Sequence, residues 1–305
     1  FGIYHQRFKR FIFHHTRMNS IGIIGFGALG SSLAHRFHEQ GILSWILKQD
    51  GKPVFEEKNI PIFSSLETIP VEDTIIILAV PDSEIPGLAK QFHVLHAHKG
   101  CHALIHCSGS LGRNVLQGSD TSIKQMCMHP FQSIASPLDL DQTPWGIDCD
   151  EADYPILEKV VLSLKGIPFL LSDHTIAHKS LYHATAVISS NLLQMLMALS
   201  VKMAQEAELP PELFLPRIQS TVMNRVHESL RESRSPLENL TGPLIRGDIE
   251  TIVSNRKALR SINGLDEVYV ALCKATLPLL IEQNRLGNQD LERLLVALTF
   301  DSSKR

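Results

Sequence analysis

The sequence predicts an α/β protein in which a Rossmann-type doubly wound sheet is followed by a second, all-α domain. Three observations predict this fold. A glycine-rich turn lies near the start of the chain, apolar runs of strand length alternate with helical segments after it, and long helical patterns with few strand signals follow from residue 173. We therefore expect a Rossmann dinucleotide-binding domain over residues 18–172 and a helical domain for substrate binding and dimerisation over residues 173–305.

The glycine-rich turn lies in the stretch SIGIIGFGALGSSLAHRF, residues 20–37. The isoleucines before the turn predict a buried strand, and the apolar residues after it recur at helical spacing. In this context Gly25 allows a tight turn, Gly27 lets a pyrophosphate approach the backbone, and Gly30 lets the helix and the strand pack closely. A GxGxxG pattern alone is also compatible with a simple glycine-rich turn. We expect a dinucleotide to be bound by the residues of this turn: Gly25, Phe26, Gly27, Ala28, Leu29 and Gly30.

Further strands are predicted from apolar runs of strand length, separated by segments of βαβ size. They cover residues 44–48, 74–80, 102–107, 124–128, 145–149 and 167–171. The run TIIILAV is almost entirely apolar, as expected for a strand covered on both faces of a parallel sheet. A helix is predicted over residues 151–164, between the last two strands. Long helices begin after residue 172, so the domain boundary is predicted near Ser172.

The composition is that of an ordinary globular protein, because 44% of the 305 residues are hydrophobic and 20% are charged. The net charge of -3 gives no basic surface that would indicate nucleic-acid binding. The five cysteines are odd in number and show no CxxC spacing, which argues against a disulfide framework and against a zinc site. We expect a cytoplasmic protein without a metal ion or a nucleic-acid partner.

Two segments could be mistaken for targeting or membrane segments. Residues 1–17 are basic and lack acidic residues, as in a targeting peptide, but translated upstream sequence or a fragment end would look the same. We expect this extension to lie outside the fold. Residues 184–204 approach membrane-spanning length, yet they include Asn191, Gln194 and Lys202. We therefore expect a buried central helix and no membrane contact.

Polar turns follow three of the predicted strands. Pro81 and Asp82 follow the first of these strands, which ends at Val80, Ser108 follows the second, and His129 follows the third. Ligands bind at the carboxyl ends of the strands in an open α/β sheet, so these residues are candidates for the site. Each turn alone is compatible with a purely structural role, but the convergence of three at one sheet edge indicates a functional site. We expect Val80, Pro81, Asp82 and Ser108 to bind the cofactor.

The helical domain opens with HKSLYHATAVISSN, in which Lys179, His183 and Asn191 follow one another at offsets of four and eight. At these offsets the three side chains fall within about a third of the helix circumference. This stripe has the groups to donate a proton and to hold a carbonyl substrate through an amide, so we expect the three residues to be catalytic. A polar edge on a helix between two domains would have the same pattern.

The loop LTGPLIRGD places Thr241 and Arg246 among glycines and a proline. An arginine within rigid turns suits the capture of a carboxylate or a phosphate. We expect Thr241, Arg246 and His129 to bind the substrate. A purely structural ion pair between Arg246 and Asp248 would produce the same sequence pattern.

Four motifs carry a resemblance to a known family: HCSGSLG, MHPFQS, YHATAVISSN and LTGPLIRGD, all after the GxGxxG turn. Together they resemble the candidate NADP oxidoreductases that join a Rossmann-like domain to a helical C-terminal domain of unknown function. The resemblance runs over residues 19–280. That family is related to ketopantoate reductases, to the hydroxyacid and 6-phosphogluconate dehydrogenases and to pyrroline-5-carboxylate reductases. The resemblance implies an NADP-dependent oxidoreductase. Some members of the family are associated with ketopantoate reduction, which suggests a substrate.

The chain departs from this family at two positions. Relatives commonly have serine or arginine after the second strand, where this chain has LKQDGK. Lys48 and Lys52 favour NADP, whereas Asp50, about twenty residues beyond the glycine turn, favours NAD. The resemblance favours NADP, with Lys48 at the cofactor. Lys179 stands where relatives usually carry arginine, so it keeps the positive charge but can also donate a proton.

The sequence therefore predicts an NADP-dependent reductase of a small 2-oxo acid or related carbonyl compound, with ketopantoate as the specific expectation and NAD as the alternative cofactor. His183 or Lys179 would protonate the alkoxide, Asn191 would hold the carbonyl, and Arg246 would bind the substrate carboxylate. The competing hypothesis is a sensor that binds a dinucleotide without turnover. The apolar side chains of residues 184–204 surround nearly the whole helix, which predicts a homodimer formed by the helical domains.

Overall fold

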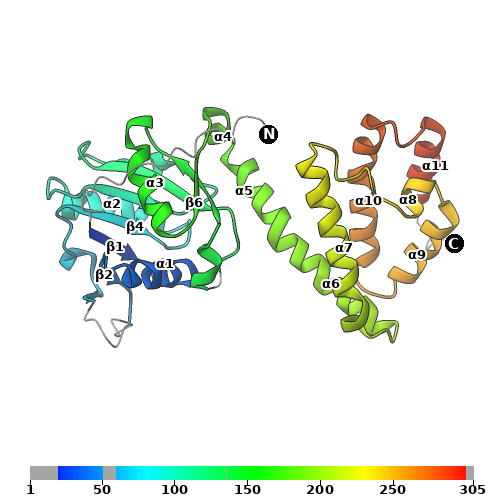
Figure 1. Cartoon of the computed structure of the whole chain (residues 1–305), viewed down its shortest axis with the longest axis horizontal. Helices are drawn as coiled ribbons and strands as arrows, with labels where there is room; N and C mark the ends of the chain where they lie inside the picture. The colour runs from blue at the N-terminus through cyan, green and yellow to red at the C-terminus, as the bar shows by residue number, and fades with distance from the viewer. Residues whose placement is uncertain (1–19, 51–59, 135, 300–305) are drawn as a thin grey trace. The chain divides into compact units, whose positions relative to one another are not determined.

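The computed structural model describes residues 20–50, 60–134 and 136–299, which form two compact units divided between Gln194 and Met195 (Figure 1). The predicted extension at residues 1–17 and the side chain of Lys52 lie outside the described residues. The predicted domain boundary at residue 172 falls at the Ser172 N-cap of α4 (Asp173–Ala177), within the first unit.

The first unit is built on an eight-stranded sheet with the order β3-β2-β1-β4-β5-β6-β7-β8. Neighbouring strands are parallel except for β6 and β7, which are antiparallel. The strands are β1 (Ser20–Ile24), β2 (Leu43–Leu47), β3 (Ile62–Phe63), β4 (Thr74–Leu78), β5 (Ala103–His106), β6 (Lys124–Pro130), β7 (Pro144–Asp148) and β8 (Ile167–Leu170). The predicted doubly wound sheet is confirmed, and the two-residue β3 is the strand that the sequence did not predict.

Helices cover both faces of the sheet, as a mostly parallel sheet requires. One core cluster joins one face of the strands to α1 (Ala28–Glu39) and α3 (Tyr154–Ser163). A second cluster joins the opposite face to α2 (Ile85–His96). The strands β1 and β4 are therefore buried on both faces, which explains their nearly continuous isoleucine content.

The second face becomes polar where the sheet continues into β5, β6 and β7. His106 of β5 lies opposite Cys127 of β6, and Cys127 lies opposite Asp148 of β7. All three side chains are buried. Side chains alternate between the two faces along a strand, so the apolar neighbours Ile105, Met126 and Ile147 belong to the core cluster on the other face. The sheet thus carries a buried polar row beside the start of the helical segment.

That segment begins with α4 and continues in α5 (Lys179–Val187), a π-helical turn η5 (Ile188–Leu192) and α6 (Leu193–Glu206). The second unit is all helical beyond residue 194, as predicted, and its core cluster includes Leu277, Leu280 and Leu294. Its further helices are α7 (Pro211–Arg231), α8 (Pro243–Arg246), α9 (Ile249–Leu259), α10 (Leu265–Glu282) and α11 (Asn288–Thr299).

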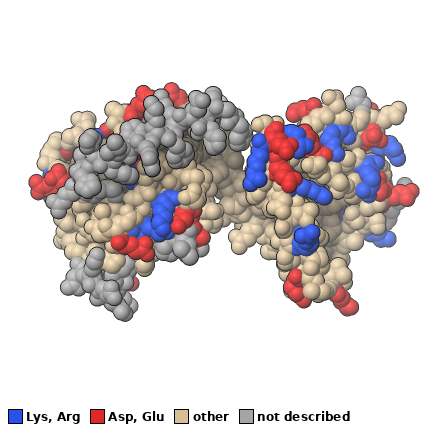
Figure 2. All heavy atoms as spheres, viewed as in Figure 1, with Lys and Arg blue, Asp and Glu red and all other residues tan. Residues whose placement is uncertain are grey.

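The helix formed by α5, η5 and α6, Lys179–Glu206, is long and apolar enough to span a membrane by length and composition alone. A single such helix is weak evidence for a membrane protein. The predicted burial of residues 184–204 is wrong for the single chain, because Ala204 is the only buried residue among them and the others are half-buried or exposed. Elsewhere, Lys and Arg side chains are interspersed with Asp and Glu on the face that Figure 2 shows.

Candidate functional site

The glycine-rich turn has the backbone geometry that the sequence predicts. Gly25 has φ of +99°, and a Cβ there would collide with the carbonyl oxygen of Ala79. A Cβ on Gly30 would collide with the carbonyl oxygen of Gly25, so the helix packs directly on the turn. Gly27 has φ of -74°, and a Cβ on it would meet no protein atom within 4 Å. The fold therefore leaves room for a side chain at position 27, and contact of Gly27 with a ligand stays a prediction.

A pocket of about 650 Å³ opens beside this turn at the carboxyl ends of β1, β2 and β4. Its lining includes residues 25–29 of the turn, Lys48 to Asp50 after β2, and Ala79, Val80 and Pro81 after β4. Most of the residues predicted to bind the cofactor, Val80 and Pro81 among them, therefore lie around one cavity. Gly30 and Asp82 are not among the lining residues.

Lys48 and Asp50, which pointed to different cofactors in the sequence, form an ion pair. The Lys48 Nζ lies 2.9 Å from Oδ1 of Asp50 and 5.2 Å from the centre of the Phe26 ring. Lys48 is mostly buried, and Asp50 is more exposed. The ammonium group is therefore held at the mouth of the pocket, where a 2′-phosphate could replace the carboxylate as its partner.

Asp82 and Ser108 connect the loops that follow β4 and β5. The Ser108 hydroxyl donates to Oδ2 of Asp82 at 2.7 Å, and the Ser110 hydroxyl donates to the same oxygen at 2.5 Å. The Ser108 oxygen also accepts from the backbone N–H groups of Ser110 and Leu111. The hydroxyl of Ser108 is buried and fully used in shaping this loop. Contact of Asp82 and Ser108 with a cofactor stays a prediction.

Two imidazoles converge over Gly109, in the same loop. A Cβ on Gly109 would lie 2.6 Å from Nε2 of His129 and 2.6 Å from Nδ1 of His183. The two ring centres are 5.8 Å apart. The Nδ1 atom of His183 is buried without a hydrogen-bond partner among the described residues. The two rings thus pack against Gly109, and no side chain fits between them at this position.

His129 is held in its neutral form by its surroundings. Burial lowers its pKa to about 4, with the nearby His183 and Lys179 adding to the shift. Its other ring nitrogen, Nδ1, is 3.0 Å from the phenol oxygen of Tyr182. Tyr182 was not among the predicted site residues, because an aromatic residue on a helix most often belongs to a core.

A small pocket of about 160 Å³ lies between the loop after β6 and the helix α5–η5. It is lined by His129, His183 and Asn191, together with residues 130–133 and several small residues of the helix. The π-helical turn Ile188–Leu192 includes Asn191 and follows the α5 turns that carry His183, and π-helical turns often occur at functional sites. The structure thus brings together His129, His183 and Asn191, as predicted, although through a local geometry that the sequence did not predict.

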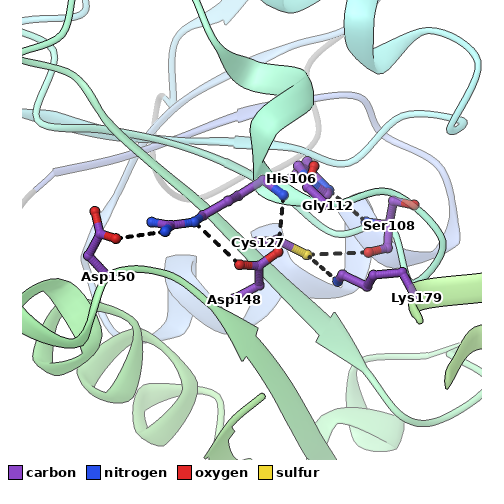
Figure 3. Close-up of polar contacts among 8 residues, drawn as sticks. His106, Ser108, Gly112, Cys127, Asp148, Asp150 and Lys179 are labelled. Atoms are coloured by element: carbon purple, nitrogen blue, oxygen red, sulfur yellow. Dashed lines mark hydrogen bonds and ion pairs between the residues drawn. The ribbon is translucent and has the colours of Figure 1, made fainter. Parts of the chain in front are cut away.

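The side chain of Lys179 has different surroundings from that of His183. Its Nζ lies 3.4 Å from the thiol of Cys127, and the residue is only 5% exposed (Figure 3). Burial raises the pKa of Cys127 to about 11, so the thiol is protonated at neutral pH. Lys179 lines a separate pocket of about 760 Å³, with Ser110, Arg113 and Asp148 among its neighbours. The predicted stripe of three residues is therefore divided between two cavities.

Asp148 and His106 complete the buried polar row and were not predicted from the sequence (Figure 3). Asp148 accepts from the backbone N–H of Arg113 at 3.1 Å, and its other oxygen lies 3.4 Å from Nε of that arginine. Arg113 also donates to Asp150 at 2.6 Å. The His106 ring lies between the N–H of Ser108 and the carbonyl of Gly112, and burial lowers its pKa to about 4.

Thr241 and Arg246 belong to the second unit. Arg246 ends α8, is exposed, and lies 3.7 Å from Asp248. Asp248 caps α9 by accepting from the backbone N–H and the hydroxyl of Thr251. The ion pair between Arg246 and Asp248, which was the alternative role for this arginine, is present. A role of Thr241 and Arg246 in substrate binding stays a prediction.

Comparison with known proteins identifies both parts of the chain. Residues 12–130 match the Rossmann-like domain, and residues 143–276 match the domain of unknown function DUF2520. No curated protein matches. Among solved structures, a Bacteroides fragilis protein described as a candidate NADP oxidoreductase has a TM-score of 0.66 at 21% identity, over 84% of this chain and 97% of that chain.

Two further solved structures share the fold. The pyrroline carboxylate reductase of Plasmodium falciparum, solved with NADP bound, has a TM-score of 0.52 at 16% identity, over 92% of this chain and 95% of that chain. A reductive aminase of Aspergillus terreus, solved with cyclohexanone and allyl amine, has a TM-score of 0.57 at 14% identity, over 88% of this chain and 95% of that chain. The chain belongs to the proteins in which a Rossmann-like domain is followed by a DUF2520 domain.

Proposed function

We propose that this protein is an oxidoreductase that uses NADP(H) to reduce a small substrate with a carbon–oxygen or carbon–nitrogen double bond. The observation that carries the proposal is the convergence of His129 and His183 over Gly109, in the same unit as the glycine turn at residues 25–30. The turn offers a place for the pyrophosphate, and the two imidazoles offer a hydrogen-bond donor and a proton.

NADP(H) is favoured over NAD(H) by the ammonium group at the mouth of the dinucleotide pocket. Lys48 would bind the 2′-phosphate of NADP(H). In the absence of the cofactor, the ion pair with Asp50 holds the Lys48 ammonium group in place. The solved structures with the same fold include one described as a candidate NADP oxidoreductase and one with NADP bound, which supports the same choice.

When bound, the nicotinamide supplies a hydride to the substrate carbon. His129 and His183 act on the other atom of the double bond, the oxygen or nitrogen. His129 donates a hydrogen bond to it, and His183 transfers a proton to it, while the Asn191 amide lies in the same pocket. Carbon thus gains a hydride, oxygen or nitrogen gains a proton, and the nicotinamide is oxidised. His183 is preferred to Lys179 as the acid because the Lys179 ammonium contacts Cys127 instead of this pocket.

The size and charge of the pocket and the solved structures with the same fold support the choice of substrate classes to test. A cavity of about 160 Å³ takes a small reacting group, and none of its lining residues is an arginine or a lysine. The pyrroline carboxylate reductase and the reductive aminase that share the fold make imines the first class to test. The 2-oxo acids, with ketopantoate among them and Arg246 as the carboxylate ligand, are the second class.

The test is a turnover assay with purified full-length protein. NADPH oxidation is followed with a panel of cyclic imines, ketone and amine mixtures, and 2-oxo acids, and NADH is compared with NADPH on every active substrate. We expect turnover with at least one member and a preference for NADPH. Failure of the protein to bind NADPH or NADH in a thermal-shift assay would contradict the proposal, whereas tight binding without turnover on the whole panel would favour the sensor hypothesis.

A further inference from the structure

The phenol of Tyr182 is fixed against His129 by packing on several sides. Its ring makes edge contacts with His129 at 5.4 Å and with Phe131 at 5.2 Å between ring centres. Its oxygen lies so close to Gly146 of β7 that a Cβ on that glycine would collide with it. The Tyr182 side chain therefore has one position, with its oxygen 3.0 Å from Nδ1 of His129.

The direction of this hydrogen bond follows from the chemistry of the two groups. Burial raises the pKa of Tyr182 well above its usual value, so the phenol keeps its hydrogen. His129 Nδ1 is the one hydrogen-bond partner of this phenol among the described residues. A buried hydroxyl without an acceptor is costly, so the phenol donates and Nδ1 accepts. A neutral imidazole carries one hydrogen, which must then lie on Nε2.

We propose that Tyr182 is a positioning residue that holds the neutral imidazole of His129 with its hydrogen on Nε2, the ring nitrogen on the Gly109 side. The Nε2 atom is the one that would lie 2.6 Å from a Cβ on Gly109, and His129 lines the small pocket. In the other tautomer, Nε2 would carry a lone pair, which would repel a substrate oxygen or nitrogen placed beside it. The catalytic consequence rests on the proposed function, but the tautomer itself does not.

The tautomer is measured directly by nuclear magnetic resonance on full-length protein labelled with ¹⁵N-histidine, at a pH where His129 is neutral. The nitrogen shifts and the couplings to ring protons distinguish the two forms, and the His129 signals are those that disappear in His129→Gln. We expect the Nε2–H form in the wild-type protein and a shift toward the Nδ1–H form in Tyr182→Phe. Phe131→Leu is the matched control, because it disturbs the same ring cluster and leaves the phenol in place. An Nδ1–H form in the wild type, or an unchanged pattern in Tyr182→Phe, would overturn the proposal even if the enzyme is active.

Kinetics with a substrate identified by the turnover panel give the second measurement. Loss of one oriented hydrogen bond is worth about 1.4 kcal/mol, so Tyr182→Phe should lower kcat about tenfold with an unchanged Kd for NADPH. Gln has an N–H donor in place of Nε2–H and no ring nitrogen to orient. In the His129→Gln background, Tyr182→Phe should therefore cause no further loss, whereas an equal tenfold loss in both backgrounds would show a role independent of His129.

Discussion

The ammonium group of Lys179 lies 3.4 Å from the thiol of Cys127, in a buried row that also holds His106 and Asp148. Its positive charge lowers the pKa of both His106 and His129. Lys179 therefore contributes to keeping two imidazoles neutral, whereas His183 packs against Gly109 and lines the small pocket with His129. The two residues that the sequence left as alternative proton donors have different surroundings, and substitutions can separate their roles.

Replacing His183 with alanine removes the proposed acid. We expect His183→Ala to lower kcat by roughly a hundredfold to ten-thousandfold, with little change in the Kd for NADPH. Lys179→Met keeps the length of the side chain and removes its charge, so it should retain turnover within about tenfold of the wild type. It should also raise the pKa values of His106 and His129 in an NMR titration. An active His183→Ala protein beside an inactive Lys179→Met protein would transfer the acid role to Lys179.

Replacing Gly27 with valine should remove cofactor binding and leave the protein folded. The backbone at this position accepts a side chain, and a Cβ there would meet no protein atom within 4 Å, so the obstruction falls on the pyrophosphate. The control is Gly87→Ala in α2, where a Cβ also meets no protein atom; Gly87 itself does not line the pocket, although Glu84 and Leu88 do. Titration of NADPH fluorescence measures both affinities. Unchanged affinity in Gly27→Val would contradict the assignment of the pocket.

Two neutral imidazoles, the buried His106 and the half-buried His129, predict a loss of stability in mild acid. The pKa of His106 and of His129 is about 4 in the folded protein, against about 6.5 in the unfolded chain. Between these values the unfolded chain binds more protons, so the free energy of unfolding falls as the pH is lowered from about 6.5 toward about 4. Each pKa unit corresponds to about 1.4 kcal/mol per group at most. Urea midpoints measured across this range should fall steeply.

A pair of variants separates this effect from general acid destabilisation. His106→Gln can keep a donor to the carbonyl of Gly112 and has no titrating group, so its midpoint should depend less on pH. His227→Gln, on an exposed position of α7, should leave the pH dependence as it is. Equal slopes for the wild type and both variants would show that His106 does not carry the effect.

The fold could be predicted from the sequence where local patterns determine it. The isoleucine run of β4 reflects burial of that strand on both faces of the sheet. The glycine spacing after β1 reflects a tight strand-to-helix turn. Each pattern lies within one short segment of the sequence, so it can be recognised without knowledge of distant contacts. The two-residue strand β3 was missed because two apolar residues make no period. The burial of residues 184–204 was predicted wrongly because an apolar composition does not show what, if anything, covers a helix.

The site depends on contacts between distant residues, so less of it could be predicted. His129 and Ser108 were found because the predicted strands end just before them, although β6 continues through His129 to Pro130. Asp148 became a neighbour of Cys127 only through the antiparallel pairing of β6 and β7, which no local pattern indicates. The phenol of Tyr182 fits against β7 because Gly146 has no side chain, and Gly146 lies 36 residues earlier in the chain by residue number.

The last prediction concerns assembly through the long helix and its neighbour α7. Large apolar side chains on these helices are exposed in the single chain: Leu181, Ile188, Leu192, Leu193, Met195, Leu213, Ile218, Val222, Met223 and Leu230. Exposed apolar side chains on neighbouring helices fit an interface between copies of the chain, and two-fold dimers are the commonest soluble oligomers. We therefore propose a homodimer whose interface buries more than roughly 1,000 Å² in total.

Light scattering at micromolar concentration tests the dimer and should give about twice the monomer mass of 34.0 kDa. Ile188→Asp, at a position 62% exposed, should shift the protein toward the monomer, whereas Val94→Asp on α2, at a position 78% exposed, should not. A wild-type mass near 34.0 kDa would contradict the dimer, and the apolar residues of the long helix would then need another partner.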